Sequence, residues 1–280
     1  MKSTKLTSLN IQSWNVHGLF YRVNGFRYSK LDDPSFMQIL TREHIFALIE
    51  TWHTKQDVDL LEIPGYRCYS IARPRAALAK GRPNGGIAVY VQDSIRTGVS
   101  QCQTISTENI FLKLKKDFFG MESNIVLGMG YCAPSNSTYL AKHQIDPFED
   151  LEKNLSVLSK EGDFLLLGDM NARCHTRPEF IEPGGDHGIP EFETLAELVQ
   201  EDTIATFLRN NIDCGVNSYG DKLIDLCRTA NLRFLNGKKW GTSWATQPTM
   251  DLMGFLLLTM VWPHLTFFVR STVLLSKILT

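Results

Sequence analysis

The chain has 280 residues, with 29 Lys and Arg against 30 Asp and Glu and a formal net charge of −1. This balance excludes attraction to nucleic acid by overall charge, so any such attraction has to be local. The length suits one large α/β domain with a substantial core, and the sequence contains neither an internal repeat nor a low-complexity linker.

The six cysteines are widely scattered and none forms a CxxC pair. A chain of this size does not need disulfides for stability, so this pattern indicates a reduced, intracellular protein. The first 14 residues, MKSTKLTSLNIQSW, contain no apolar run of signal-peptide length. We therefore expect no secretory signal.

Short segments rich in β-branched and aromatic residues alternate with amphipathic segments along the chain. We expect strands at residues 8–14, 44–50, 86–91, 109–114, 124–131 and 163–169, and helices at 146–162 and 220–232, with a third starting in 32–40. The helix at 146–162 opens with Asp146 and Pro147, which suit a cap and a first turn. This alternation predicts an α/β fold in which helices cover a sheet.

Residues 252–280 are much more apolar than the sequence before them and contain two charged residues, Arg270 and Lys277. A membrane span needs about 20 mostly apolar residues, but Pro263 and His264 interrupt this run. We therefore divide the chain into a domain over 1–251 and an atypical tail over 252–280, and do not favour a membrane anchor.

Oxygen-bearing side chains follow several of the predicted strands at the point where each strand ends. They are Asn15, Glu50, Tyr131, Asp169 and Asn171. In an open α/β sheet, ligands bind beyond the strand ends, so these side chains can share one cleft. Carboxylates and carboxamides are hard ligands that suit Mg²⁺ or Mn²⁺. Each residue alone also has an ordinary interpretation, such as an Asx turn for the GDMN segment.

A basic segment, ARPRAALAKGR at 72–82, lies between two predicted strands and contains no acidic residue. Its cations are Arg73, Arg75, Lys80 and Arg82. A loop of this kind suits contacts with a phosphate backbone, which supply affinity without sequence readout. An ordinary solvated loop remains the alternative.

Six segments, taken in order, resemble the endonuclease/exonuclease/phosphatase (DNase I-like) superfamily. They are SWNVHGL, ALIETWH, NGGIAVYV, GYCAPSNS, LLLGDMNAR and NLRFLNG, and the resemblance covers about residues 8–251. Within the superfamily the chain is similar to the endonuclease domains of non-LTR (LINE-type) retrotransposons. The resemblance implies a four-layer α/β/β/α sandwich and Mg²⁺-dependent hydrolysis of phosphodiester bonds in DNA, without a small-molecule cofactor, and hence action in the nucleus.

The resemblance also implies roles for individual residues. Glu50 would bind the metal with Asn15 beside it, and Asp169 would orient or deprotonate the attacking water. Asn171 would hold a phosphate oxygen, and Tyr131 would donate its hydroxyl to the phosphate. Asn136 matches an asparagine after the same strand as Tyr131, and Asp251 matches a later aspartate in the family pattern; His17 stands where several relatives have an acidic residue.

The family pattern ends with a Ser-Asp-His triplet, and residues 252–280 contain none. His264, the last histidine, has no acidic neighbour. Either the reading frame is shifted after NGKKWGTSW, or the chain is a variant that has lost catalysis. We therefore expect a fold that is incomplete at the C-terminus, with an uncovered sheet edge or core face, and impaired activity. The functional alternatives are a non-catalytic nucleic-acid-binding remnant and a membrane-anchored phosphoesterase acting on lipid or inositol phosphates.

Overall fold

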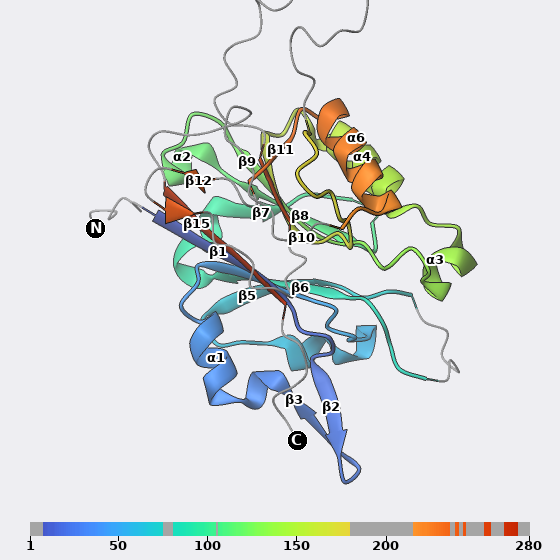
Figure 1. Cartoon of the computed structure of the whole chain (residues 1–280). Helices are drawn as coiled ribbons and strands as arrows, with labels where there is room; N and C mark the ends of the chain where they lie inside the picture. The colour runs from blue at the N-terminus through green and yellow to red at the C-terminus, as the bar shows by residue number, and fades with distance from the viewer. Residues whose placement is uncertain are drawn as a thin grey trace, which may run out of the picture.

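The computed structural model describes residues 8–74, 81–104, 106–179, 215–235, 239–240, 243–244, 255–258 and 266–273. Two β-sheets lie face to face, and helices cover the outer face of each (Figure 1). This is the α/β/β/α arrangement that the family resemblance implied, and the predicted strands and helices appear within a few residues of their expected bounds.

The first sheet has five strands in the order β15-β1-β4-β6-β5. Their bounds are β1 (Ser8–Asn15), β4 (Ile45–Ile49), β5 (Tyr66–Ile71), β6 (Ile87–Gln92) and β15 (Thr266–Val273). Strands β1 and β4 are parallel, and Asn15 is the register partner of Ile49. Because parallel strands end at the same edge, the residues after β1 and β4 are neighbours.

The second sheet has six strands in the order β11-β14-β10-β9-β8-β7. Their bounds are β7 (Val99–Gln101), β8 (Asn109–Leu114), β9 (Ile125–Tyr131), β10 (Asp163–Asp169), β11 (Arg233–Phe234) and β14 (Phe255–Leu258). Strands β9 and β10 are parallel, and Tyr131 is the register partner of Asp169. Each sheet therefore contributes one parallel pair of strands to the site.

Three clusters of buried side chains hold the layers together. Along β4, Ile45, Ala47 and Ile49 face the other sheet, whereas Phe46 and Leu48 face outward. This alternation follows from the two-residue period of a strand, and it explains why strands buried on both faces appear in the sequence as unbroken apolar runs.

Helices complete the two outer layers. The outer face of the first sheet packs against α1 (Pro34–Leu40) and the 3-10 helix η2 (Lys55–Leu61). The outer face of the second packs against α4 (Pro147–Leu158) and α6 (Ser218–Thr229). Asp146 caps α4 as predicted, because its side chain accepts hydrogen bonds from the backbone N–H groups of Phe148 and Glu149.

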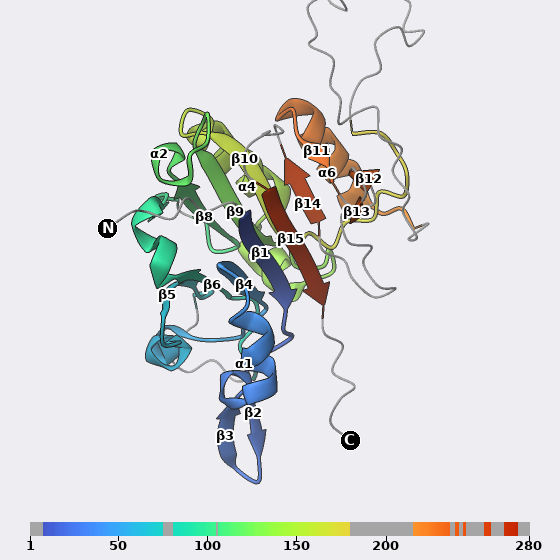
Figure 2. The same cartoon turned by 90° about the vertical axis from the view of Figure 1, so that its left-hand side faces the viewer.

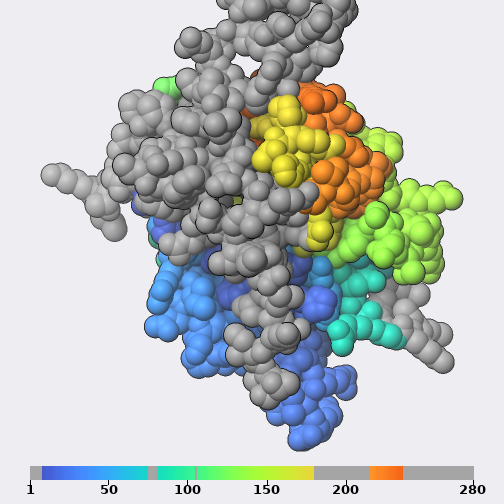
Figure 3. Space-filling model, viewed as in Figure 1, coloured from blue at the N-terminus to red at the C-terminus, as the bar shows by residue number. Residues whose placement is uncertain are grey.

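The shorter elements lie at the periphery. They are the hairpin strands β2 (Phe20–Val23) and β3 (Phe26–Ser29), the pair β12 (Lys239–Trp240) and β13 (Ser243–Trp244), the helices α2 (Lys116–Phe119) and α3 (Thr138–His143), and the 3-10 helices η1 (Lys30–Asp32) and η3 (Asp93–Gly98). Figure 3 shows one further close approach, between the segment ending at residue 179 (yellow) and α6 (orange). An ion pair between Arg177 and Asp221 joins these two parts of the chain.

The apolar tail contributes a strand to each sheet. Strand β15 pairs in parallel with β1, and β14 pairs antiparallel with β10 (Figure 2). We expected an uncovered sheet edge here, and at these two positions that expectation was wrong, because apolar segments of strand length satisfy the backbone groups of β1 and β10. Among the described residues, no helix is long and apolar enough to cross a membrane.

Candidate active site

The first half of the site follows strands β1 and β4. Backbone hydrogen bonds from Val16 N to Ile49 O (2.9 Å) and from Gly18 N to Glu50 O (2.7 Å) continue the parallel pairing past the strand ends. His17 and Glu50 both have positive φ, 45° and 54°. This conformation is uncommon for residues with a Cβ and tends to occur where function requires it.

The second half follows strands β9 and β10. Asn171 donates its backbone N–H to Asp169 Oδ1 (3.1 Å), so the GDMN segment does form an Asx turn. Asn171 also donates its side-chain Nδ2 to Cys132 O (2.8 Å), which ties the turn to the residue after Tyr131. The turn interpretation and the site interpretation of this segment are therefore compatible.

Asn15 connects the two halves. Its Nδ2 donates to Glu50 Oε1 (3.0 Å) in the first half and to Asp169 Oδ2 (2.9 Å) in the second. Its Oδ1 accepts the backbone N–H of His17 (3.0 Å), and this bond fixes the orientation of the carboxamide. His17 Nδ1 lies 3.2 Å from Glu50 Oε2. The contacts thus bring Asn15, His17, Glu50 and Asp169 together across the gap between the sheets.

Burial controls the protonation of the second half. It raises the pKa of Asp169 to about 6; the hydrogen bonds from Asn15 and from the backbone of Asn171 oppose this rise, and the charge of Glu50 adds to it. Burial also raises the pKa of Tyr131, as do its hydrogen bond with Glu50 and the charges of Glu50 and Asp169. Near neutral pH, Asp169 is therefore an ionised carboxylate with unusual basicity and Tyr131 is a protonated hydrogen-bond donor.

The oxygen donors of the site fit a magnesium ion. Among the described residues, no three His, Cys, Asp or Glu side chains gather closely enough to form a metal cage. Mg²⁺ does not require one, because it keeps several waters and binds through one or two carboxylates plus a substrate phosphate. Glu50 is suited to this role, since its side chain is 13% exposed and sits beside the Asn15 carboxamide. The donor set does not distinguish Mg²⁺ from Mn²⁺.

The cations of the basic segment do not share one environment. Arg82 is exposed, with its guanidinium 4.7 Å from the ring centroid of Trp52. Arg73 instead is buried and forms two hydrogen bonds with Glu108, so our expectation of an exposed phosphate-binding residue was wrong for Arg73. Arg75 and Lys80 lie outside the described residues.

The remaining candidates are not joined to the cluster. Asn136 is exposed in a turn after β9, and within the described part of the chain no hydrogen bond connects it to Asn15, Glu50 or Asp169. Asp251 and His264 lie outside the described residues.

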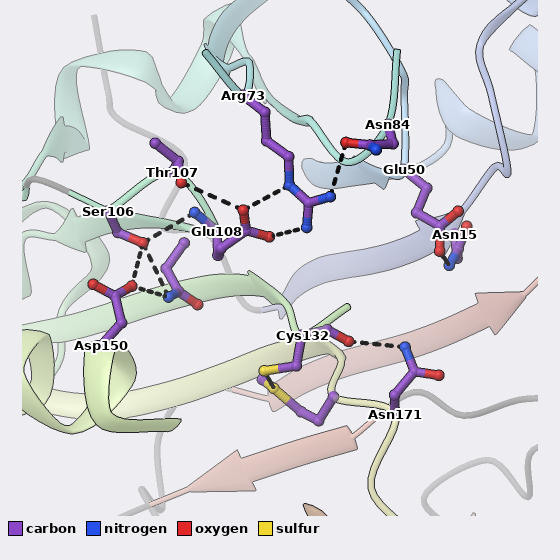
Figure 4. Close-up of polar contacts among 12 residues, drawn as sticks. Asn15, Glu50, Arg73, Asn84, Ser106, Thr107, Glu108, Cys132, Asp150 and Asn171 are labelled. Carbon is purple, nitrogen blue, oxygen red and sulfur yellow. Dashed lines mark hydrogen bonds and ion pairs between the residues drawn. The ribbon is translucent and has the colours of Figure 1, made fainter. Parts of the chain in front are cut away.

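The structure adds two contributors to the site that the sequence did not indicate. Trp52 has φ 55° and its ring lies beside His17, with centroids 4.6 Å apart. Glu108 is buried before β8 and pairs with Arg73 (Figure 4). The segment ETWH placed Trp52 next to Glu50 in the sequence, but nothing in the sequence linked Glu108 to a residue 35 positions earlier.

The comparisons with known proteins bear on this arrangement. The sequence model of the Endonuclease/Exonuclease/phosphatase family matches residues 13–250, most of the chain and all of the described site. The chain belongs to this family. No curated protein sequence matches it. The family assignment agrees with the two-sheet fold and with polar side chains at the strand ends.

Several solved structures match the chain. An AP endonuclease, LMAP, from Leishmania major has a TM-score of 0.51 at 14% identity, and the match covers 88% of this chain and 78% of that one. A 3′ phosphatase, NExo, from Neisseria, bound to a product DNA hairpin, has a TM-score of 0.44 at 14% identity, covering 89% and 86%. The 3′-5′ exonuclease NExo from Neisseria meningitidis has a TM-score of 0.37 at 17% identity, and this chain spans 59% of its length. At this level of identity, the match to LMAP supports the fold alone.

Proposed function

We propose that this member of the family is a divalent-metal-dependent endonuclease of the retrotransposon type, which hydrolyses phosphodiester bonds in DNA. The observation that carries the proposal is the bridge made by Asn15, which joins Glu50 of one sheet to Asp169 of the other at 3.0 and 2.9 Å. A buried amide that holds two carboxylates close together suits the binding of a cation and a phosphate group.

Each residue of the bridge has a task in this reaction. Glu50, oriented by the Asn15 amide, would hold Mg²⁺ or Mn²⁺, which when bound offsets the negative charge that develops on the phosphate. Asp169 accepts the proton of the attacking water, a role that its raised pKa supports because a stronger base accepts the proton more readily. Holding these groups in place before the substrate arrives lowers the barrier.

The substrate phosphate is held by neutral donors. Tyr131 donates its hydroxyl, which its raised pKa keeps protonated. Asn171 contributes its amide, one N–H of which is engaged with Cys132 O while a carboxamide carries two. Arg82, exposed and stacked on Trp52, is our choice for a contact with the DNA backbone. Asn136, Arg75, Lys80 and Asp251 remain proposed from the sequence.

The experiment is nicking of supercoiled plasmid with Mg²⁺, with and without chelator. We expect weak nicking, since the 280 residues contain no Ser-Asp-His triplet after Asp169. Chelator abolishes it, and Asp169→Ala lowers the rate by about 100-fold or more, the usual effect of losing a general base. The matched control is Asp163→Asn, at the opposite end of the same strand.

Three outcomes are decisive. Nicking that survives Asp169→Ala would contradict the site, and nicking that survives chelation would contradict the metal requirement. Plasmid binding without any nicking would favour the non-catalytic remnant.

A further inference from the structure

An ion pair bridges the two sheets beside the active site. Arg73 follows β5 in the first sheet and Glu108 precedes β8 in the second. Arg73 donates Nε to Glu108 Oε1 (2.7 Å) and Nη2 to Glu108 Oε2 (2.6 Å), the two-pronged geometry that makes such a pair rigid. The side chains are 5% and 2% exposed, so water does not screen the pair.

The surroundings of Arg73 leave it little freedom. Its Nη1 donates to Asn84 Oδ1 (3.0 Å), on the segment that leads into β6. A Cβ added to Gly85 would lie 2.5 Å from Arg73 Nε, so the backbone of this glycine lies directly against the guanidinium. Figure 4 shows the guanidinium between Glu108 and Asn84, on the side of the site that carries Glu50. These contacts hold the cation in one orientation.

The ion pair also contacts Tyr131 from two directions. The backbone N–H of Tyr131 donates to Glu108 O (2.9 Å), while Arg73 Cζ lies 5.5 Å from the centroid of the Tyr131 ring. Arg73 Cζ also lies 4.1 Å from the centroid of Tyr139, so the cation is close to two aromatic rings. One residue therefore fixes the backbone of Tyr131 and its partner supports the ring.

Stability alone does not explain such a pair. Burial raises the pKa of Glu108, and the hydrogen bonds and charge of Arg73 oppose the rise without cancelling it. Taking both charges out of water costs free energy, and apolar replacements of similar volume are often neutral or stabilising. A role in positioning explains the buried pair better. It joins the two sheets beside the place where Asn15 contacts both Glu50 and Asp169.

We propose that Arg73, held by Glu108, is a positioning residue that fixes the Tyr131 ring and the separation of the two halves of the site; this rests on the proposed function. In this role it does not touch DNA. Its effect falls on the rate of the chemical step and not on substrate affinity, because small displacements of reacting groups are costly.

The first test compares Arg73→Met, Arg73→Lys and the double variant Arg73→Met/Glu108→Leu in plasmid nicking. We expect Arg73→Met to lower kcat by about 100-fold with little change in KM. Arg73→Lys recovers part of kcat, since it keeps the cation but not the two-pronged bond. The double variant leaves no unpaired buried charge and therefore folds, yet it keeps the low kcat.

The control is Arg67→Lys, which alters an arginine 5.4 Å from the ring of Tyr69, away from the site. We expect it to leave kcat and KM unchanged. Wild-type kcat in the folded double variant would overturn the proposal, because Arg73 and Glu108 would then be needed only to neutralise each other's buried charge.

A second readout does not depend on activity. 3-Fluorotyrosine placed at position 131 reports the surroundings of that ring through its ¹⁹F resonance. We expect Arg73→Lys to shift and broaden the resonance and Arg67→Lys to leave it unchanged. If the wild-type protein cuts no DNA, the proposed function fails, and the ¹⁹F resonance alone decides whether Arg73 positions Tyr131. An unchanged resonance in Arg73→Lys would refute the positioning role.

Discussion

The two halves of the site differ in exposure and in backbone conformation. In the first half, His17 is 57% exposed and Glu50 13% exposed, and both have left-handed backbone. In the second half, Asp169 and Tyr131 are buried at the ends of regular strands. The buried side chain of Asn15 joins the two halves through hydrogen bonds to Glu50 and Asp169.

In the proposed reaction, this difference separates two chemical tasks. A carboxylate that is to bind a cation needs access to solvent, and Glu50 has it. A carboxylate that is to accept a proton benefits from burial, which raises the pKa of Asp169 to about 6. One fold can thus produce two kinds of carboxylate within one site by placing them on different sheets.

The largest expected effect concerns the rigid backbone of the second half. Gly168 has φ 148°, and a Cβ added there would lie 1.9 Å from Gly130 O on the neighbouring strand. We therefore expect Gly168→Ala to lower the free energy of unfolding by about 4 kcal/mol or more, since neither backbone can yield without breaking the ladder. Chemical denaturation measures it.

The matched control for that variant is Gly25→Ala. Gly25 also has positive φ, 85°, but a Cβ there would meet nothing within 4 Å. The expected cost is about 1 kcal/mol, from the left-handed backbone alone. Equal losses in the two variants would mean that the close approach of β9 and β10 does not constrain the site.

The next effect tests the burial of Asp169. Its folded pKa, about 6, lies above the ordinary value of 3.8, so between these pH values the folded protein binds a proton that the unfolded chain does not. Stability contributed by this residue therefore falls as the pH rises through this window, by on the order of 2 to 3 kcal/mol. In Asp169→Asn this part of the pH dependence disappears.

Chemical denaturation in the presence of chelator, repeated between about pH 4 and pH 7, measures the effect. Asp163→Asn, on the same strand, keeps Asp169 and should retain the part of the pH dependence that Asp169 contributes. Identical curves for wild type and Asp169→Asn would show that Asp169 is not buried as described and would remove the contrast between the halves.

A third effect tests the cation-binding half. We expect Glu50→Gln to weaken Mn²⁺ binding by about tenfold or more, because a neutral amide replaces the partly exposed carboxylate. Asp169→Asn should weaken it less, and Glu62→Gln, a variant at an exposed position, not at all. Titration of free Mn²⁺ followed by electron paramagnetic resonance measures the three affinities, and a larger loss in Asp169→Asn than in Glu50→Gln would reverse the assignment of roles.

The sequence predicted the parts of the site that depend on strands. Asn15, Glu50, Tyr131 and Asp169 were found because unbroken apolar runs mark buried strands and polar residues after them mark their ends. Parallel pairing then brings the ends together. The hairpin of β2 and β3 is also encoded locally, since Asn24-Gly25 between them is a strong hairpin signal.

The sequence did not predict the parts that depend on tertiary partners. Arg73 lies in a basic segment and looks exposed there, but its environment is set by Glu108 and by the backbone of Gly85. The pairing of the apolar tail was missed for a related reason: its segments FLLL and TFFVRSTV have no alternation to show which strand they join. Local sequence patterns identify helices and strands, whereas contacts between residues far apart in the chain are determined by the complete fold.

The smallest expected effect concerns Arg82, which we propose as a DNA contact at the exposed side of the first half. Its guanidinium stacks on Trp52, whose ring lies beside His17, so the cation is held near Glu50. Because a single exposed phosphate contact contributes little, Arg82→Ala should weaken DNA binding by about 1 kcal/mol or less and reduce the salt dependence by about one phosphate contact. Fluorescence anisotropy with duplex DNA at several salt concentrations measures both.

The control is Arg42→Ala, at an exposed position before β4, at the end of that strand opposite the site. It should change neither the affinity nor the salt dependence. An unchanged salt dependence in Arg82→Ala would show that the DNA binds on another face, away from the exposed side of the first half.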